Sequence, residues 1–321
     1  MALGEFELID RYFRRPVRRA ALGVGDDCAL LQPTPGWQLA VSSDLLVEGR
    51  HFLSTVDPAR LGHKALAVNL SDLAACGARP LAFTLALALP RADEGFLAPF
   101  AQGLLALAEA HDIELVGGDT TAGPLTIGIT VIGEVPAGQG LLRSAAQVGD
   151  TVWISGRLGD ARLALEAFRG TLALDAAGWA QARSAMETPQ PRVALGQALR
   201  GVAHAAIDLS DGLLGDLRHV LRASGVGATL HLAELPHSAL LAGQDDALRQ
   251  TCLLAGGDDY ELLFTAAAQA EGRVLAAARA CGVPVQAVGQ IDPAADGLRV
   301  LDARGQPLDL SRWASFDHFK V

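Results

Sequence analysis

Lysine is nearly absent from this sequence. Of its 26 basic residues only Lys64 and Lys320 are lysines, so arginine supplies most of the positive charge. Neither lysine lies in a glycine-rich loop, and the GxxxxGK(S/T) pattern of a P-loop does not occur. A complete GxGxxG is missing too, because Gly23-Val24-Gly25 runs directly into an aspartate. These absences argue against the two common nucleotide fingerprints. Any phosphate chemistry therefore needs metal ions and arginine in place of a P-loop lysine.

Cysteines and long apolar runs are also scarce. The four cysteines have no CxxC spacing, which argues against a zinc or redox motif and predicts buried free thiols. Such usage is typical of a reducing compartment. Residues 1–16 lack the continuous apolar core of a secretory signal, and the longest apolar run, about 80–90, is too short to cross a bilayer. We therefore expect a cytoplasmic protein with no membrane association.

Acidic residues outnumber basic residues by 36 to 26, which gives a formal net charge of −10. This balance argues against a nucleic-acid partner, which normally requires a basic surface. It does not exclude a small anionic ligand, because bound metal ions can invert the local field. Half of the 321 residues are hydrophobic, which is enough for the cores of about two domains.

Strands and helices alternate without a strict βαβ repeat, which predicts an α+β fold with two α/β domains, residues 1–140 and 141–321. A tight glycine turn is expected at Gly117-Gly118. The expected strands are 29–31, 38–42, 81–89, 114–116, 126–135, 151–155, 205–208, 228–232, 261–266 and 285–290. The expected helices are 6–13, 58–76, 93–110, 160–168, 193–199, 212–224 and 268–280.

Aspartates recur at or near the ends of apolar segments. Clustered carboxylates need a counter-charge, because like charges repel and desolvation is costly. The pattern therefore predicts that they converge on divalent cations, and oxygen-only ligands favour Mg²⁺, Mn²⁺ or Ca²⁺ over zinc. A helix cap or a turn is the more common explanation for any single aspartate, whereas five such sites on apolar flanks favour a shared metal site. The candidate ligands are Asp27, Ser42, Ser43, Asp44, Asp72, Asp119, Asp208 and Asp211, with Ser210 beside the last two.

Four further residues have both a functional and a structural explanation. Gly118 permits close approach of backbone N–H groups to an anion, or it forms an ordinary hairpin turn. Arg143 is a candidate phosphate clamp or a surface arginine. His51 is either a substrate contact or a structural residue. Phe316 either stacks on a planar ring of a ligand or packs as part of the C-terminal tail. No Ser/His/Asp or Cys/His arrangement marks a covalent nucleophile.

Eight motifs occur in order along the chain. They are Gly4-Glu5-Phe6, Gly23-Val24-Gly25-Asp26-Asp27-Cys28-Ala29, Ser42-Ser43-Asp44, His51-Phe52, Lys64 to Asp72, Gly117-Gly118-Asp119-Thr120-Thr121, Ile207-Asp208-Leu209-Ser210-Asp211-Gly212-Leu213 and Gly257-Asp258-Asp259-Tyr260-Glu261-Leu262. With these motifs the chain resembles the thiamine-monophosphate kinases from Gly4 to Phe319. That family belongs to an ATP-binding superfamily with aminoimidazole ribonucleotide synthetase and selenophosphate synthetase.

The resemblance implies a two-domain α/β fold, a homodimer joined through strands of the N-terminal domain, and transfer of the γ-phosphoryl group of ATP to thiamine monophosphate with several Mg²⁺ ions. It implies metal ligation by all eight candidate ligands above. It also implies ATP contacts by Gly118, Asp119, Arg143 and Ser210, and substrate contacts by His51, Asp258 and Phe316. The family often has Thr at Ser43 and Glu at Asp258.

No general base or covalent intermediate is expected, so we predict direct in-line transfer. Two alternatives remain open. One is another ATP-dependent enzyme of the same superfamily, although selenophosphate synthetase is disfavoured because no Cys or Lys lies in an N-terminal glycine-rich segment. The other is a catalytically silent nucleotide- or metal-binding regulator, which the complete set of acids disfavours.

Overall fold

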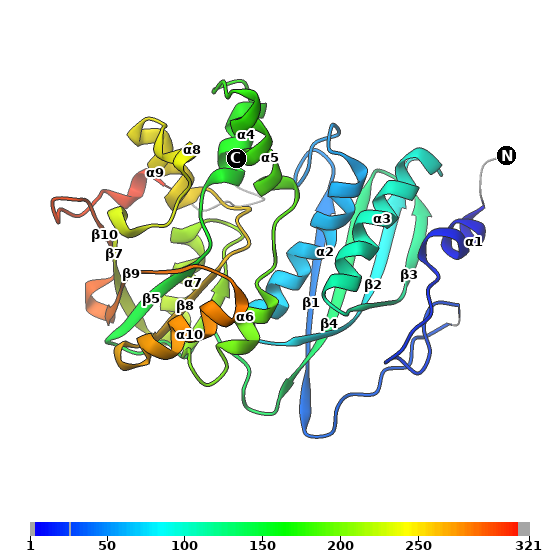
Figure 1. Cartoon of the computed structure of the whole chain (residues 1–321), viewed down its shortest axis with the longest axis horizontal. Helices are drawn as coiled ribbons and strands as arrows, with labels where there is room; N and C mark the ends of the chain where they lie inside the picture. The colour runs from blue at the N-terminus through cyan, green and yellow to red at the C-terminus, as the bar shows by residue number, and fades with distance from the viewer. Residues whose placement is uncertain (1–3, 26, 314–321) are drawn as a thin grey trace. The chain divides into compact units, whose positions relative to one another are not determined.

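The computed structural model of the chain describes residues 4–25 and 27–313 (Figure 1). The chain divides into two compact units, one made of Met1–Leu73 with Ala78–Gly138 and the other of Ala74–Gly77 with Gln139–Val321. The first contains a four-stranded sheet and the second a six-stranded sheet, each accompanied by helices. The predicted mixed fold of α-helices and β-sheets is therefore confirmed.

The first unit is built on a sheet with the strand order β1-β4-β2-β3. The strands are β1 (Trp37–Val47), β4 (Thr126–Pro136), β2 (Arg79–Leu89) and β3 (Glu114–Ala122). β4 pairs antiparallel with both of its neighbours, whereas β2 and β3 are parallel. A parallel pair needs a crossover connection, and helix α3 (Glu94–Ala110) provides it. A short α1 (Glu5–Leu8) and a π-helical turn η1 (Ile9–Phe13) precede the sheet.

Helix α2 (Pro58–Ala75) and α3 pack on one face of this sheet (Figure 1). Glycines allow the two helices to touch, because a Cβ on Gly103 would lie 1.9 Å from the carbonyl oxygen of Ala59. The signals that predict these helices are confirmed: Pro58 occupies the first turn of α2, and the Asp93 carboxylate accepts a hydrogen bond from the Gly95 N–H at 2.9 Å.

The second unit contains the strand order β10-β7-β9-β5-β8-β6. Its strands are β5 (Asp150–Ser155), β6 (Ala205–Asp208), β7 (Val226–His231), β8 (Leu262–Ala267), β9 (Val285–Pro293) and β10 (Leu298–Leu301). Its helices are α4 (Asp160–Phe168), α5 (Ala176–Glu187), α6 (Val193–Ala198), α7 (Leu213–Ser224), α8 (Ala239–Ala242), α9 (Asp246–Ala255) and α10 (Glu271–Cys281). Short 3-10 turns are η2 (Leu232–Glu234), η3 (Ala268–Ala270), η4 (Ala294–Asp296) and η5 (Leu310–Arg312).

The prediction of a tight glycine turn at Gly117-Gly118 is wrong. Both glycines lie inside β3, which continues to Ala122, and the pairing with β2 shifts register next to them. Gly118 has a φ of +146°, so the irregularity is absorbed within the strand by a residue without a side chain. The chain reverses only at residues 123–125, after β3, and the Gly123 N–H still donates to the Leu89 carbonyl oxygen of β2 at 2.9 Å.

Three other expectations need correction. Residues 29–31 form no strand beyond a single bridge between Leu30 and Leu22. The helix expected over 6–13 is divided into α1 and the π-helical η1. All four cysteines are free as predicted, but only Cys252 is buried, and Cys28 is exposed. Among the described residues no helix combines the length and hydrophobicity needed to cross a membrane.

Candidate functional site

Two of the predicted metal ligands meet where β1 packs against α2. The Ser42 hydroxyl donates a hydrogen bond of 2.6 Å to Oδ2 of Asp72. Strand alternation turns the neighbouring Ser43 to the opposite face, where its hydroxyl contacts the carbonyl oxygen of Ile129 at 3.1 Å and the hydroxyl of Thr130 at 3.0 Å. Ser42 and Asp72 therefore present adjacent oxygen donors, and the Ser43 hydroxyl is directed elsewhere.

Asp44 is held one residue further along the same strand. Its backbone N–H donates to Oδ1 of Asn69 at 3.1 Å, and the Asn69 amide donates in turn to the carbonyl oxygen of Ala65 at 3.0 Å. Asn69 is almost completely buried in α2, with 1% of its surface exposed. Sequence reasoning includes Asn69 in a family motif but gives it no role. Its buried amide in an apolar helix is the signal that identifies it as a residue that positions Asp44.

His51 closes the turn that follows β1. Its Nδ1 accepts a hydrogen bond of 3.0 Å from the Val47 N–H, and this contact holds the ring against the turn. A structural role for one nitrogen is thereby established. A substrate contact would have to use the Nε2 side of the ring.

Asp27 and Asp119 line one pocket of about 480 Å³ in the first unit. Its walls are residues of the N-terminal helical turns, the residues Val24, Gly25, Asp27 and Ala29, and the glycine-rich part of β3. Gly118 is required there, because a Cβ at this residue would lie 1.9 Å from the carbonyl oxygen of Leu85. The structure thus brings the predicted residues Asp27, Gly118 and Asp119 to the same cavity.

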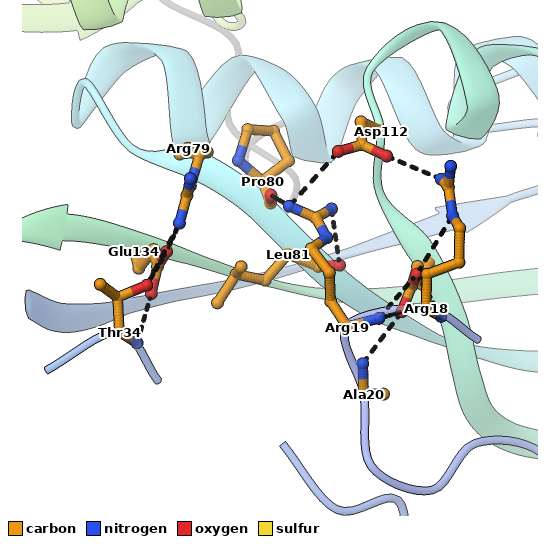
Figure 2. Close-up of polar contacts among 10 residues, drawn as sticks. Arg18, Arg19, Ala20, Thr34, Arg79, Pro80, Leu81, Asp112 and Glu134 are labelled. Atoms are coloured by element: carbon orange, nitrogen blue, oxygen red, sulfur yellow. Dashed lines mark hydrogen bonds and ion pairs between the residues drawn. The ribbon is translucent and has the colours of Figure 1, made fainter. Parts of the chain in front are cut away.

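A buried carboxylate fixes the N-terminal segment to the start of β3. Glu114 accepts backbone N–H hydrogen bonds from Arg18 at 2.7 Å, from Arg19 at 3.2 Å and from Ala20 at 3.1 Å. Figure 2 shows the side chains of Arg18 and Arg19 both reaching Asp112, at 2.7 and 3.6 Å. Burial raises the pKa of Glu114, but the three N–H donors and Arg19 outweigh it, so that the pKa lies below its ordinary value.

A second buried carboxylate, that of Glu134, also fixes the N-terminal segment to the sheet. Glu134 on β4 is fully buried and pairs with Arg79, and it accepts hydrogen bonds from the N–H and the hydroxyl of Thr34 at 3.0 and 2.8 Å (Figure 2). Together with Glu114, it ties both ends of the segment that carries Asp27 to the sheet, one end at residues 18–20 and the other at Thr34.

In the second unit Asp208 ends the buried strand β6, and a loop leads from it into α7. The buried carboxylate of Asp216 accepts N–H hydrogen bonds from Ser210, Asp211 and Gly212 at 3.1, 3.1 and 3.2 Å. Burial and the neighbouring Asp211 carboxylate raise the pKa of Asp216 to about 7. Asp216 therefore organises the predicted motif, although sequence reasoning gives it no role. Its signal is an acid in the first turn of an amphipathic helix that begins with two leucines.

The loop containing Asp258 pairs with this motif through its backbone. The Asp258 N–H donates to the carbonyl oxygen of Ser210 at 2.8 Å, and the Tyr260 N–H donates to that of Leu209 at 2.8 Å. The Leu209 N–H donates to the carbonyl oxygen of Glu261 at 2.9 Å. Two motifs about fifty residues apart in the sequence are thus one paired structure in the second unit.

Glu261 fixes the end of this loop. Its carboxylate accepts hydrogen bonds from the Ser155 hydroxyl at 2.5 Å and from Nε of Arg192 at 2.6 Å. Glu261 lies against Gly156, where a Cβ would overlap the carboxylate, so this contact requires glycine. Burial raises the pKa of the nearby Asp259 carboxyl well above its ordinary value, although an N–H from Gly159 at 2.8 Å partly offsets the effect.

Arg143 lies in the segment that runs beside β6. Leu142 bridges to Ala205, and the Arg143 carbonyl oxygen accepts a hydrogen bond of 2.9 Å from the Ser224 hydroxyl at the end of α7. Its guanidinium is exposed and, among residues 4–25 and 27–313, pairs with no carboxylate. Phe316 falls outside the described residues.

The oxygen donors of the first unit suit Mg²⁺ in their chemistry. Ser42 with Asp72, and Asp27 with Asp119, supply hydroxyl and carboxylate oxygens in pairs. No group of three or more His, Cys, Asp or Glu side chains able to hold a metal occurs within the described part of the chain. Mg²⁺ is commonly held by one or two carboxylates plus substrate phosphates rather than by an all-protein cage, so the donor pairs fit this mode of binding.

Comparisons with known proteins agree with these motifs. Residues 25–135 match the family described as AIR synthase related protein, N-terminal domain, and residues 147–300 match its C-terminal domain. A curated thiamine-monophosphate kinase from Salmonella typhimurium is 45% identical over 325 residues, covering 99% of both chains.

Solved structures give the same result. The thiamine-monophosphate kinase from Stenotrophomonas maltophilia aligns with a TM-score of 0.86 and 44% identity, covering 96% of this chain and 99% of that one. A structure described as AaThiL complexed with AMPPCP and TMP aligns with a TM-score of 0.77 and 27% identity, covering 90% and 89%. This chain therefore belongs to the thiamine-monophosphate kinase family of the AIR synthase related proteins.

Proposed function

We propose that this protein transfers the γ-phosphoryl group of ATP to thiamine monophosphate and so forms thiamine diphosphate. The observation that carries the proposal is the match to curated thiamine-monophosphate kinases over 99% of the chain. The related structure described as complexed with AMPPCP, an ATP analogue, and TMP supports the same pair of ligands.

The chemistry demands little proton transfer. A phosphate monoester has a second pKa of about 6, so the acceptor is already largely dianionic at pH 7. A general base therefore contributes little. The main obstacle is the repulsion between two polyanions that must meet in line, and a site for this reaction has to offset that repulsion and align the reacting oxygens.

Several Mg²⁺ ions, rather than one, are proposed for the site. Asp44 pairs with Ile129, Ile129 with Leu85, and Leu85 with Gly118, so Asp44 and Gly118 lie in one row across four strands. With strands about 4.8 Å apart, the ends of this row are separated by about 14 Å. Asp119 follows Gly118 directly in β3, so Asp44 and Asp119 are too far apart to share one cation. When bound, the cations neutralise the repulsion and stabilise charge on the transferring group.

Each predicted residue has a proposed task. In the first unit Asp27 and Asp119 hold cations in the pocket beside Gly118. Ser42, Asp44 and Asp72 hold cations where β1 contacts α2. Ser43 is also a predicted ligand, but its hydroxyl is directed to the other face of the strand. In the second unit Asp208 and Asp211 complete the metal ligands. Gly118, Asp119, Arg143 and Ser210 contact ATP, and His51, Asp258 and Phe316 contact thiamine monophosphate.

A homodimer is proposed through the first sheet. β1 is an edge strand, and one of its faces exposes Leu39, Val41 and Leu45, with exposed fractions of 47%, 63% and 57%. An edge strand with exposed apolar side chains is a liability in a monomer, because it invites pairing with another chain. A second copy of the same strand is the occupant that the family resemblance implies.

The test of function is incubation of the purified protein with ATP, Mg²⁺ and thiamine monophosphate. We expect equal amounts of ADP and thiamine diphosphate. Hydrolysis of ATP without thiamine diphosphate would favour another enzyme of the superfamily, and nucleotide binding without turnover would favour a silent regulator. With chiral γ-phosphate, direct transfer inverts the configuration at phosphorus, whereas retention contradicts a single in-line step.

A further inference from the structure

We propose that Tyr260 is a positioning residue that aims the Asp258 carboxylate at thiamine monophosphate. This inference rests on the proposed function, because it assumes that Asp258 contacts that substrate. Tyr260 itself is not assigned to the substrate, the nucleotide or a metal.

The backbone around Asp258 is strained. Asp258 has a φ of +61° and Tyr260 a φ of +50°, both in the left-handed region that residues with side chains rarely adopt. Aspartate tolerates this conformation fairly well, but a bulky aromatic residue does so rarely. Two such residues within three positions persist only where the surroundings hold them, and such strain is concentrated at functional sites.

Hydrogen bonds on both sides of the turn stabilise this strained backbone conformation. Backbone hydrogen bonds of 2.8 Å tie Asp258 to Ser210 and Tyr260 to Leu209. Immediately after the turn, Glu261 is fixed by Ser155 and Arg192. The conformation is therefore imposed from the motif that ends β6 and from the start of β8.

The consequence of this conformation is a specific side-chain contact. The Tyr260 hydroxyl donates a hydrogen bond of 3.1 Å to Oδ1 of Asp258, while Asp259 between them accepts an N–H from Gly159. The Tyr260 residue is buried, with 9% of its surface exposed, so its hydroxyl is a fixed donor. A fixed donor to one carboxylate oxygen sets the rotation of the Asp258 side chain.

Removal of the hydroxyl alone tests this role. Tyr260→Phe keeps the ring and its packing, so we expect the KM for thiamine monophosphate to rise about ten-fold with little change in the KM for ATP. The loss of one hydrogen bond to a charged group has about this size. The matched control is Tyr12→Phe, since the chain has two tyrosines and Tyr12 is equally buried, and this variant should match the wild type.

A double-mutant cycle separates positioning from general destabilisation. In an Asp258→Asn background, Tyr260→Phe should change the KM for thiamine monophosphate less than two-fold, because the carboxylate it aims is gone. Multiplicative effects of the two substitutions would overturn the inference. If Asp258→Asn raises this KM and Tyr260→Phe does not, the inference fails and the proposed function stands. If neither substitution changes it, the proposed substrate role of Asp258 fails as well.

A spectroscopic measurement avoids any dependence on the folding of Tyr260→Phe. With 3-fluorotyrosine incorporated into the Tyr12→Phe variant, the single ¹⁹F resonance reports Tyr260. Thiamine monophosphate should shift this resonance, and the shift should disappear when Asp258→Asn is added. An unchanged resonance on binding, or an equal shift without the Asp258 carboxylate, would contradict the proposal.

Discussion

Ser42 and Asp72 lie thirty residues apart in the sequence, and the hydroxyl of the first donates a hydrogen bond of 2.6 Å to the carboxylate of the second. The contact joins the edge strand β1 to a helix, α2, that is otherwise largely apolar. A charged residue in such a helix needs a partner, and here the partner is itself an oxygen donor suited to a cation.

Asp72→Asn should lower turnover at least about a hundred-fold and raise the Mg²⁺ concentration needed for half-maximal rate, because the amide is a weaker ligand than the carboxylate. Ser42→Ala should have a smaller effect in the same direction. The measurement is the initial rate of thiamine diphosphate formation over a Mg²⁺ titration, with circular dichroism to confirm folding. The exposed Ser54→Ala is the control. A normal Mg²⁺ dependence in Asp72→Asn would remove this residue from the metal site.

Gly118→Ala should destabilise the first unit by at least about 2 kcal/mol and abolish nucleotide binding. The new Cβ would lie 1.9 Å from the Leu85 carbonyl oxygen, and the φ of +146° is unfavourable for alanine. Urea unfolding and binding of an ATP analogue measure the two effects. Gly123→Ala is the matched control, since its nearest contact would be 3.5 Å away. Equal stability of the two variants would show that β3 does not need glycine at 118.

Glu114→Gln should lower the free energy of unfolding at pH 7 by about 1–3 kcal/mol, because a neutral amide replaces an acceptor of three N–H groups. The folded pKa of Glu114 lies below its ordinary value, so the ionised carboxylate stabilises the fold above the unfolded pKa of about 4.3. This contribution disappears as the pH falls through the folded pKa. Urea unfolding at several pH values should therefore show the wild type and the variant converging in acid. A constant difference at all pH values would contradict this account.

Val41→Glu should convert a dimer into a monomer, since it places a charge on the exposed apolar face of β1. Sedimentation equilibrium should give about twice the 33.4 kDa of one chain for the wild type and the single-chain mass for the variant. Leu142→Glu, at a similarly exposed leucine of the second unit, should leave the mass unchanged. A wild type that sediments as a monomer would refute the proposed homodimer.

Helices with strong terminal signals are predictable from the sequence. The expected bounds 160–168 of α4 agree with the structure, and those of α2 and α3 differ by one residue at most at each end. Proline at the first turn, an aspartate cap and a terminal glycine are local features, so no tertiary information is needed. Helices α5 and α9 were not expected, although Asp175 and Asp245 cap them, because an aspartate at such a position is equally typical of a turn. Strand β10 was not expected because it is only four residues long.

Gly117 and Gly118 show why the site was only partly predictable. Glycine pairs commonly mark turns, and only the register of β2 and β3 reveals a strand that tolerates a positive φ. The aspartates can be proposed as ligands from the sequence alone, because clustered carboxylates point to cations whatever the fold. The sequence does not reveal the roles of Glu114, Asp216 and Tyr260. The partners of Glu114 lie about a hundred residues away in the sequence. Asp216 and Tyr260 act within loops whose shape no local sequence pattern encodes.

The position of β4 between β1 and β2 also governs how this chain is made. A ribosome releases residues 37–47 long before residues 126–136, and β1 has no other neighbour in its sheet. Throughout that interval the nascent strand keeps its backbone groups and its leucines without a partner. We therefore expect the first unit to be exposed to aggregation during synthesis, and the demand for chaperones to fall once β4 has left the ribosome and can pair with β1.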